Sequence, residues 1–123
     1  KILTDDKWFS FVLEQLLSNA LKYTMQGEIH IYAREDKNGL QVVISDTGIG
    51  IKREDLPRLF ERGFTGYNGR MDKKASGLEL YLCKGICNKL GHQIFIESEV
   101  GKGTQVIIQM QYEKLNHTDL TKM

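Results

Sequence analysis

The 123-residue sequence has few of the residues that mark secreted, membrane or nucleic-acid-binding proteins. It contains only two cysteines, so it lacks the disulfide framework of small secreted domains, and a reducing, cytoplasmic setting is expected. Its formal net charge is +1, from 17 basic and 16 acidic residues, which argues against nucleic-acid binding through bulk charge. No apolar run approaches the roughly 18–20 residues that a membrane span needs.

The length suits one domain with its own core. The chain begins with Lys1 rather than methionine, so we expect it to be a piece of a longer protein. Cys83 and Cys87 are one helical turn apart on an apolar face, where free cysteines behave as small hydrophobes, so core packing is their simplest role. Metal binding would need more ligands than the nearby sequence offers.

Hydrophobic periodicity predicts helices that alternate with β-hairpins. In the first helix an apolar stripe recurs at three- and four-residue steps, at Trp8, Val12, Leu16, Ala20 and Tyr23. The predicted elements are a helix over 7–24, a hairpin of strands 28–35 and 40–45, a short helix over 57–61 that starts at the single proline, a mobile loop over 63–75, a helix over 78–90, and a hairpin of strands 93–99 and 104–112. This order predicts an α+β fold of two layers, in which a mixed, largely antiparallel sheet is covered by helices on one face. A generic α+β domain without a site is the alternative.

Three segments carry polar residues and glycines in patterns that suggest a nucleotide site. Gln15, Asn19 and Lys22 share one polar edge of the first helix, Asp46-Thr-Gly48-Ile49-Gly50 follows a strand, and Ser76-Gly77-Leu78-Glu79-Leu80 opens the next helix. Each pattern alone is weak, because a single Asn commonly faces solvent or packs between helices and Asp-x-Gly-x-Gly is also an ordinary turn. Their occurrence together favours a site.

The residue types fit that chemistry. The neutral amide oxygen of Asn19 suits an octahedral Mg²⁺ that also binds phosphates and waters. The ionised carboxylate of Asp46 only accepts hydrogen bonds, so it can take one from the adenine amino group and would repel the guanine carbonyl. Gly48 and Gly50 let the backbone turn tightly and approach a ring. Backbone N–H groups at the start of the helix after Ser76 can cradle phosphates.

Together these segments resemble the ATP-binding catalytic domain of bacterial sensor histidine kinases, whose Bergerat fold is shared with the gyrase, Hsp90 and MutL ATPases. The resemblance runs from about Lys7 to about Gln111. Gln15 and the segment Gly63-Phe64-Thr65-Gly66 are most similar to the small sensor kinases of peptide-antibiotic systems. The resemblance implies Mg²⁺ binding by Asn19, and ATP binding by Asn19, Lys22, Tyr23, Asp46, Gly48, Ile49, Gly50, Phe60, Gly66, Arg70, Ser76, Gly77, Leu78, Leu80 and Thr104.

Within that set, the roles differ. The resemblance implies phosphate contact for Lys22, ribose or phosphate contact for Tyr23, and an adenine pocket completed by Thr104. Phe60 and Phe64 would hold the ends of a lid that closes over the nucleotide, and simple core packing is their alternative role. Arg70, with Lys73 and Lys74, would neutralise the triphosphate or form a solvated basic loop.

One residue departs from the family's pattern. Where the family usually has Gly-x-Gly-Leu, this sequence has Gly77-Leu78-Glu79-Leu80, so a carboxylate replaces a phosphate-facing glycine. Its repulsion of the phosphates, on the order of a few kcal/mol if poorly screened, would weaken ATP binding about tenfold to a thousandfold. Glutamate nevertheless suits a first helical turn, so the domain should fold well. We expect an engineered or natural inactivating change; a Glu79 side chain that turns outward is the alternative.

Three functions stay open at this stage: kinase domain, ATPase and nucleotide-dead docking module. The related ATPases have a general-base Glu four residues before the Asn, but this chain has Gln15 there, and Glu14 points about 100° away around the helix. Hydrolysis is therefore disfavoured. The three histidines, His30, His92 and His117, lie outside any helical histidine box, so no catalytic residue is expected in the fragment and it should not phosphorylate itself.

The resemblance also implies partners. ATP would phosphorylate a histidine on a dimeric helical hairpin of the same protein, and the phosphate would pass to a response regulator. The full-length protein would be a homodimer in the bacterial cell membrane, with this domain in the cytoplasm. Residues 1–112 would form the catalytic domain and 113–123 a polar tail.

Overall fold

The structure is a computed structural model that describes residues 6–24, 26–62 and 79–111, apart from the side chains of Tyr23 and Glu79. The predicted loop over 63–75 and the predicted tail over 113–123 lie outside these residues. The described elements, in chain order, are α1 (Asp6–Tyr23), β1 (Ile29–Asp36), β2 (Gly39–Asp46), a 3₁₀ helix η1 (Leu56–Arg58), α3 (Glu79–Leu90), β3 (Gln93–Glu99) and β4 (Gly103–Gln111).

The strands form one antiparallel sheet in the order β1-β2-β4-β3. β1 with β2 and β3 with β4 are hairpins of strands that follow one another in the chain, and the sheet is completed by pairing of β2 with β4. The predicted two-layer α+β fold is confirmed. In the described part of the chain the sheet is purely antiparallel, whereas the sequence favoured a mixed one.

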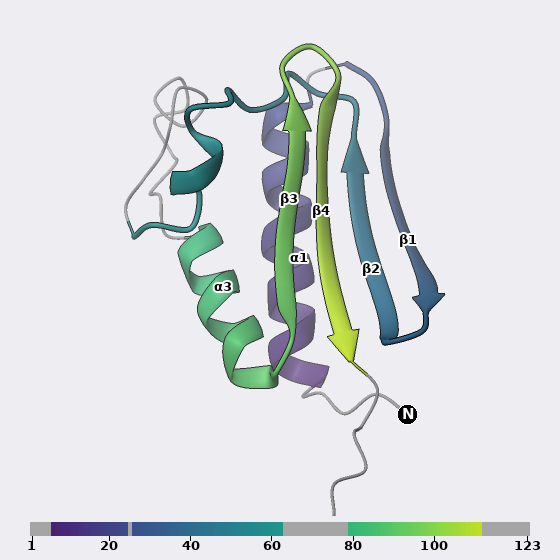
Figure 1. The fold of residues 1–123 in the computed structure, drawn as a ribbon. Helices are drawn as coiled ribbons and strands as arrows, with labels where there is room; N and C mark the ends of the chain where they lie inside the picture. The colour runs from purple at the N-terminus through teal and green to yellow at the C-terminus, as the bar shows by residue number, and fades with distance from the viewer. Residues whose placement is uncertain (1–5, 25, 63–78, 112–123) are drawn as a thin grey trace, which may run out of the picture.

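Both helices lie on the same side of the sheet (Figure 1). α1 contributes Val12, Leu16 and Ala20 to the core at steps of four residues, so one stripe of the helix is buried. Side chains from every second position of β2, β3 and β4 face this stripe, among them Ile44 and Ile108. The hydrophobic core is therefore the layer between the two helices and the three strands that they cover.

The edge strand β1 lies outside this cover. Its residues are almost all exposed, and even Ile31, which shares the face of Ile44 by register, is 53% exposed. The predicted apolar stripe was also wrong at Trp8, whose side chain is 51% exposed. In the first turn of α1 it is Phe9 that packs against the core, and Trp8 stays exposed. Its ring instead packs edge-to-face with Phe11, with centroids 6.3 Å apart.

The predicted boundaries agree with the structure except at the short helix. That helix was predicted over 57–61, but regular 3₁₀ structure covers Leu56–Arg58 and the chain continues in turns through Arg62. Pro57 lies in the first turn, where its missing N–H has no cost. The ends of all other helices and strands fall within about one residue of their predicted positions.

The two cysteines are core residues, as expected. Both side chains are fully buried where α3 packs on α1, and the Cys83 thiol is 3.9 Å from the Val12 carbonyl oxygen. Burial raises the pKa of Cys87 to about 11, although the Lys84 ammonium acts in the opposite direction. Since the thiolate is the reactive form, this thiol is inert in the folded protein.

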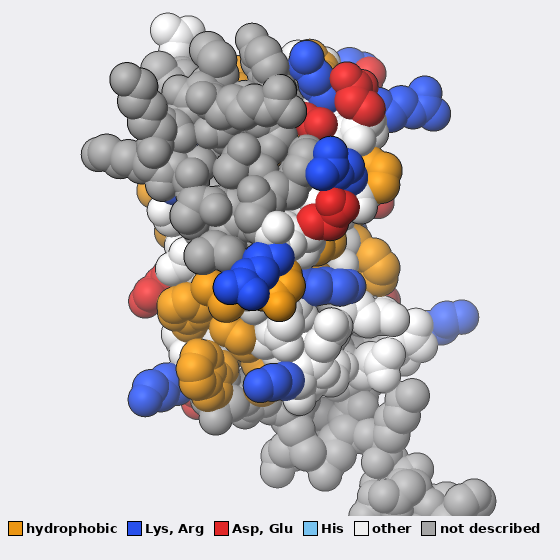
Figure 2. All heavy atoms as spheres, turned by 90° about the vertical axis from the view of Figure 1, so that its left-hand side faces the viewer, with side chains coloured by type: hydrophobic (Ala, Val, Ile, Leu, Met, Phe, Trp, Pro, Cys, Tyr) orange, Lys and Arg blue, Asp and Glu red, His pale blue; other side chains and the backbone are white. Residues whose placement is uncertain are grey.

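The side of the molecule formed by α3 carries exposed apolar groups. Tyr81 and Leu82 are 41% and 44% exposed, and Figure 2 shows hydrophobic side chains gathered with Lys and Arg on this side. None of the helices in residues 6–24, 26–62 and 79–111 is long and apolar enough to cross a membrane.

Candidate functional site

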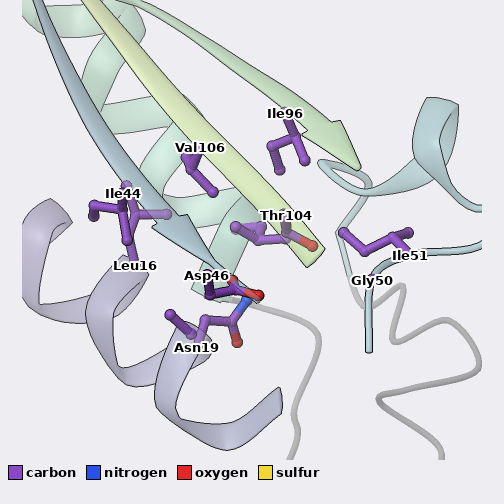
Figure 3. Close-up of a pocket in the computed structure, with 11 residues that line it drawn as sticks. Leu16, Asn19, Ile44, Asp46, Gly50, Ile51, Ile96, Thr104 and Val106 are labelled. Atoms are coloured by element: carbon purple, nitrogen blue, oxygen red, sulfur yellow. The ribbon is translucent and has the colours of Figure 1, made fainter. Parts of the chain in front are cut away.

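A pocket opens where the C-terminal half of α1 meets the end of the sheet at which β2 finishes and β4 begins (Figure 3). Its walls are mostly aliphatic, and its polar groups come from one residue each of α1, β2 and β4. The lining residues are Leu16, Asn19, Ala20, Ile44, Asp46, Gly50, Ile51, Leu80, Ile96, Thr104 and Val106.

Asn19 and Asp46 line this one pocket, as the sequence led us to expect. Asn19 is half-buried and follows Leu16 by three residues, so it lies at the border between the buried stripe of α1 and solvent. Figure 3 shows its side chain beside that of Asp46, which projects from the end of β2. An uncharged oxygen donor and a carboxylate therefore converge from the two layers of the fold.

The Asp46 carboxylate is partly engaged by its own turn. Its Oδ1 accepts a hydrogen bond from the Gly48 N–H at 2.9 Å. This local bond provides the partner that a carboxylate at the end of an apolar strand requires. It leaves Oδ2 outside the turn, on a half-buried side chain that lines the pocket.

Thr104 lies directly opposite Asp46 in the β2–β4 pairing and directly opposite Ser98 in the β3–β4 pairing. Side chains at directly opposite positions project to the same face, so these three form one polar row across the end of the sheet. The Ser98 and Thr104 hydroxyl oxygens are 2.8 Å apart. Sequence reasoning found Asp46 and Thr104 but missed Ser98, whose position is apparent only from the pairing of β3 with β4.

Gly50 is required by the fold. Its φ is +79°, and a Cβ there would overlap the carbonyl oxygen of Glu99 at the end of β3. The adjacent Ile49 carbonyl accepts a hydrogen bond of 3.0 Å from the Gly101 N–H, so the turn after β2 is joined to the β3–β4 turn. This contact accounts for Gly50 without a ligand, and the close approach of Gly48 and Gly50 to a ring stays a prediction.

A second glycine that the sequence did not single out has a similar role. Gly103, with φ of +117°, lies against the backbone of Asp46, and a Cβ there would overlap the Asp46 carbonyl oxygen. The start of β4 can therefore approach the end of β2 only if residue 103 is glycine. The Gly101-Lys102-Gly103 spacing before Thr104 is the sequence signal that could have identified this position.

The other predicted site residues are not all at this pocket. Lys22, Gly48, Ile49 and Phe60 are not among its lining residues. Phe60 packs against the hydrophobic core, and the Lys84 ammonium lies 5.4 Å from its ring centroid, which supports the core-packing alternative for this residue. Outside the described residues or side chains lie Tyr23, Phe64, Gly66, Arg70, Lys73, Lys74, Ser76, Gly77, Leu78 and the Glu79 side chain.

The pocket is smaller than a cavity that holds a whole aromatic ring. Its volume is about 50 Å³. That exceeds the roughly 10–15 Å³ needed for one water but is below the roughly 150 Å³ of a cavity that holds benzene. A base would therefore insert one edge between aliphatic walls, such as Ile44 and Val106, and extend beyond the pocket.

At this pocket a metal ion would need oxygen ligands from a bound molecule as well as from the protein. No group of three or more His, Cys, Asp or Glu side chains suited to a metal ion is found within the described residues. One amide oxygen, that of Asn19, fits a hard cation such as Mg²⁺ only if the ligand and water supply the remaining oxygens.

Comparisons with known proteins agree with this geometry. Residues 4–114 match the family described as "Histidine kinase-, DNA gyrase B-, and HSP90-like ATPase". The sensor protein kinase GraS of Staphylococcus aureus (strain JH1) is 41% identical over 105 residues, which cover 85% of this chain and 30% of that protein. GraS of strain MRSA252 is 40% identical over the same length. The chain thus spans less than a third of these curated relatives.

Solved structures show the same fold. The mycobacterial sensor histidine kinase MprB has a TM-score of 0.79 at 23% identity. The match covers 92% of this chain and 78% of the MprB chain. A nucleotide-free catalytic domain of the histidine kinase ThkA has a TM-score of 0.73 at 25% identity, and the match covers 88% of this chain and 69% of the ThkA chain. Full-length ShkA in complex with AMPPNP has a TM-score of 0.75 at 22% identity, and the match covers 91% of this chain and 23% of the ShkA chain.

The two-layer fold is thus that of histidine kinase catalytic domains. The chain belongs to the histidine kinase-, gyrase B- and HSP90-like ATPase family. Within that family it is the domain of a bacterial sensor histidine kinase.

Proposed function

We propose that this chain is the ATP- and Mg²⁺-binding catalytic domain that phosphorylates a histidine on a separate dimerisation hairpin of the same protein. The observation that carries the proposal is the convergence of Asn19 and Asp46 on one aliphatic-walled pocket. The carboxylate selects the amino edge of adenine, and the walls exclude water from the ring. The amide oxygen of Asn19 is placed to complete the coordination of a phosphate-bound Mg²⁺.

Other parts of the chain serve the phosphates and the partner domain. Lys22 follows Asn19 by one turn at the end of α1 and neutralises phosphate charge. Tyr23 contacts the ribose or phosphate, and Ser76, Gly77 and Leu78 present backbone N–H groups to the phosphates. Phe60 and Phe64 hold the ends of the lid, Gly66 belongs to the segment with which the lid starts, and Arg70 adds positive charge to it.

The intact protein acts in two-component signalling. Its phosphorylated histidine donates to a response regulator, and it is a homodimer in the bacterial cell membrane with this domain, residues 1–112, in the cytoplasm. The tail, 113–123, lies outside the domain. The fragment alone does not phosphorylate itself, because the acceptor histidine lies on the hairpin.

Gln15 argues against an ATPase. It occupies the position of the general base in the hydrolysing relatives, and a neutral amide cannot accept the proton of an attacking water. A histidine kinase needs no base at this position, since its nucleophile is supplied by another domain. We therefore expect nucleotide binding without release of phosphate.

The proposal is tested by calorimetry, which measures the affinity for ATP with Mg²⁺ of the original chain and of the variants Glu79→Gly and Glu79→Gln. The glycine variant should bind about tenfold to a thousandfold more tightly than the original chain, because both carboxylate charge and side-chain volume are removed. The glutamine variant keeps the volume, so it separates repulsion from steric exclusion. Absence of binding by all three would instead indicate a nucleotide-dead docking module, and phosphate release by the glycine variant would indicate an ATPase.

A further inference from the structure

Ser98 lies at the centre of a hydrogen-bonded cluster beside the pocket, although neither the motifs nor the pocket lining includes it. Its Oγ accepts a hydrogen bond from the Ile51 N–H at 2.8 Å and donates one to the Gly103 carbonyl oxygen at 2.8 Å. The same oxygen is 2.8 Å from the Thr104 Oγ1. Ser98 is half-buried and joins three chain segments: the loop after β2, the end of β3 and the start of β4.

The three contacts fix the direction of the hydroxyl–hydroxyl bond. A serine hydroxyl carries one proton, and a carbonyl oxygen can only accept, so the Ser98 proton is used by the Gly103 carbonyl. The contact between the two hydroxyl oxygens then requires Thr104 to be the donor. The Thr104 proton is thereby directed to Ser98, and its remaining lone pairs can only accept.

This matters because Thr104 lines the pocket and Ser98 does not. Thr104 is opposite Asp46 in the strand register, and the Asp46 carboxylate also only accepts. On the side of the sheet, the pocket therefore presents two acceptors, Asp46 and Thr104, from neighbouring strands. A group with two N–H donors on one atom, such as the exocyclic amine of a base, is complementary to them, whereas a ring carbonyl meets two acceptors.

We propose that Ser98 is a positioning residue that holds the Thr104 hydroxyl as an acceptor and thereby makes the pocket select a 6-amino purine over a 6-oxo purine. The proposal rests on the nucleotide-binding function proposed above. Ser98 acts through Thr104 and does not itself contact the base.

The test measures dissociation constants for ATP and for inosine triphosphate, with Mg²⁺, in the Glu79→Gly chain. Ser98→Ala frees the Thr104 proton for donation to the 6-oxo group, so the preference for ATP over inosine triphosphate should fall about tenfold. Ser98→Thr retains the hydroxyl on a β-branched residue suited to a strand and should retain the preference. Ser45→Ala is a matched control, because Ser45 is the half-buried neighbour of Asp46 on the opposite face of β2.

A second background shows whether Ser98 acts through Thr104. In Thr104→Val the hydroxyl is absent, so Ser98→Ala should leave the ratio of the two dissociation constants unchanged there. If Ser98 only stabilised the turn, its loss would weaken both nucleotides equally in every background, and the ratio would not move; that result overturns the proposal. Binding of neither nucleotide by the Glu79→Gly chain would overturn the nucleotide-binding function and this proposal together.

Discussion

Gly50 lies directly against the carbonyl group of Glu99, so at this point the turn that follows β2 meets the end of β3 backbone to backbone. That contact sets the position of Ile51, which lines the pocket and donates its N–H to Ser98. The packing of two turns thus supports the site, and three glycines allow its contribution to stability to be measured.

Gly50→Ala should lower the free energy of unfolding by about 3 kcal/mol, because the new Cβ meets both a left-handed backbone and the Glu99 carbonyl. Gly91→Ala has the same φ of +79° but nothing within 4 Å of the new Cβ, so it should cost only about 1–2 kcal/mol. Gly85→Ala, within α3 and with no neighbour within 4 Å, should stabilise by about 0.5–1 kcal/mol. Urea denaturation measures all three, and equal losses for Gly50→Ala and Gly91→Ala would contradict the overlap with Glu99.

Asp46→Asn should weaken ATP binding about tenfold to a hundredfold in the Glu79→Gly background. The new Oδ1 can still accept from the Gly48 N–H, which turns the NH₂ group toward the pocket, where it opposes the amino group of adenine. Asp36→Asn is the matched control, since Asp36, at the β1–β2 turn and far from the pocket end of β2, accepts through Oδ1 from the backbone N–H groups of Asn38 and Gly39 at 3.0 and 2.8 Å. Calorimetry should show unchanged binding for Asp36→Asn; a similar loss in both variants would point to a general effect of charge.

His92 should make the domain less stable in mild acid. Its side chain is buried and packs edge-to-face with the Phe9 ring, and burial lowers its pKa from 6.5. The unfolded chain therefore takes up a proton more readily than the folded protein, so stability is fully present above about pH 6.5 and is lost as pH falls below it. Urea midpoints measured from pH 7.5 to 5.0 should fall more steeply for the original chain than for His92→Gln, and parallel curves would show that this histidine does not contribute.

The secondary structure was predictable because its signals are local. Val12, Leu16 and Ala20 follow the helical period, and the turn at Asp36–Gly39 separates two strands whose ends were placed within about one residue. Trp8 was mispredicted because periodicity identifies an apolar side of a helix but not which of its residues reach the core, and in the first turn of α1 that residue is Phe9.

Asn19, Asp46 and Thr104 could be found because each lies in a short segment of recognisable spacing. Ser98 could not, because an isolated serine in a strand carries no local signal. Its partners are Ile51, Gly103 and Thr104, and only the pairing of β3 with β4 and the packing of the turn after β2 bring them together.

The sheet order has a consequence for how binding ability arises during folding. Each hairpin closes a short stretch of chain, whereas the pairing of β2 with β4 closes a long loop and is entropically the slower step. Asp46 belongs to one hairpin and Thr104 to the other, so no early intermediate containing a single hairpin can have affinity for the ligand. Nucleotide binding would consequently require that the two hairpins have paired. A bound nucleotide would oppose separation of the two hairpins more than fraying of either one.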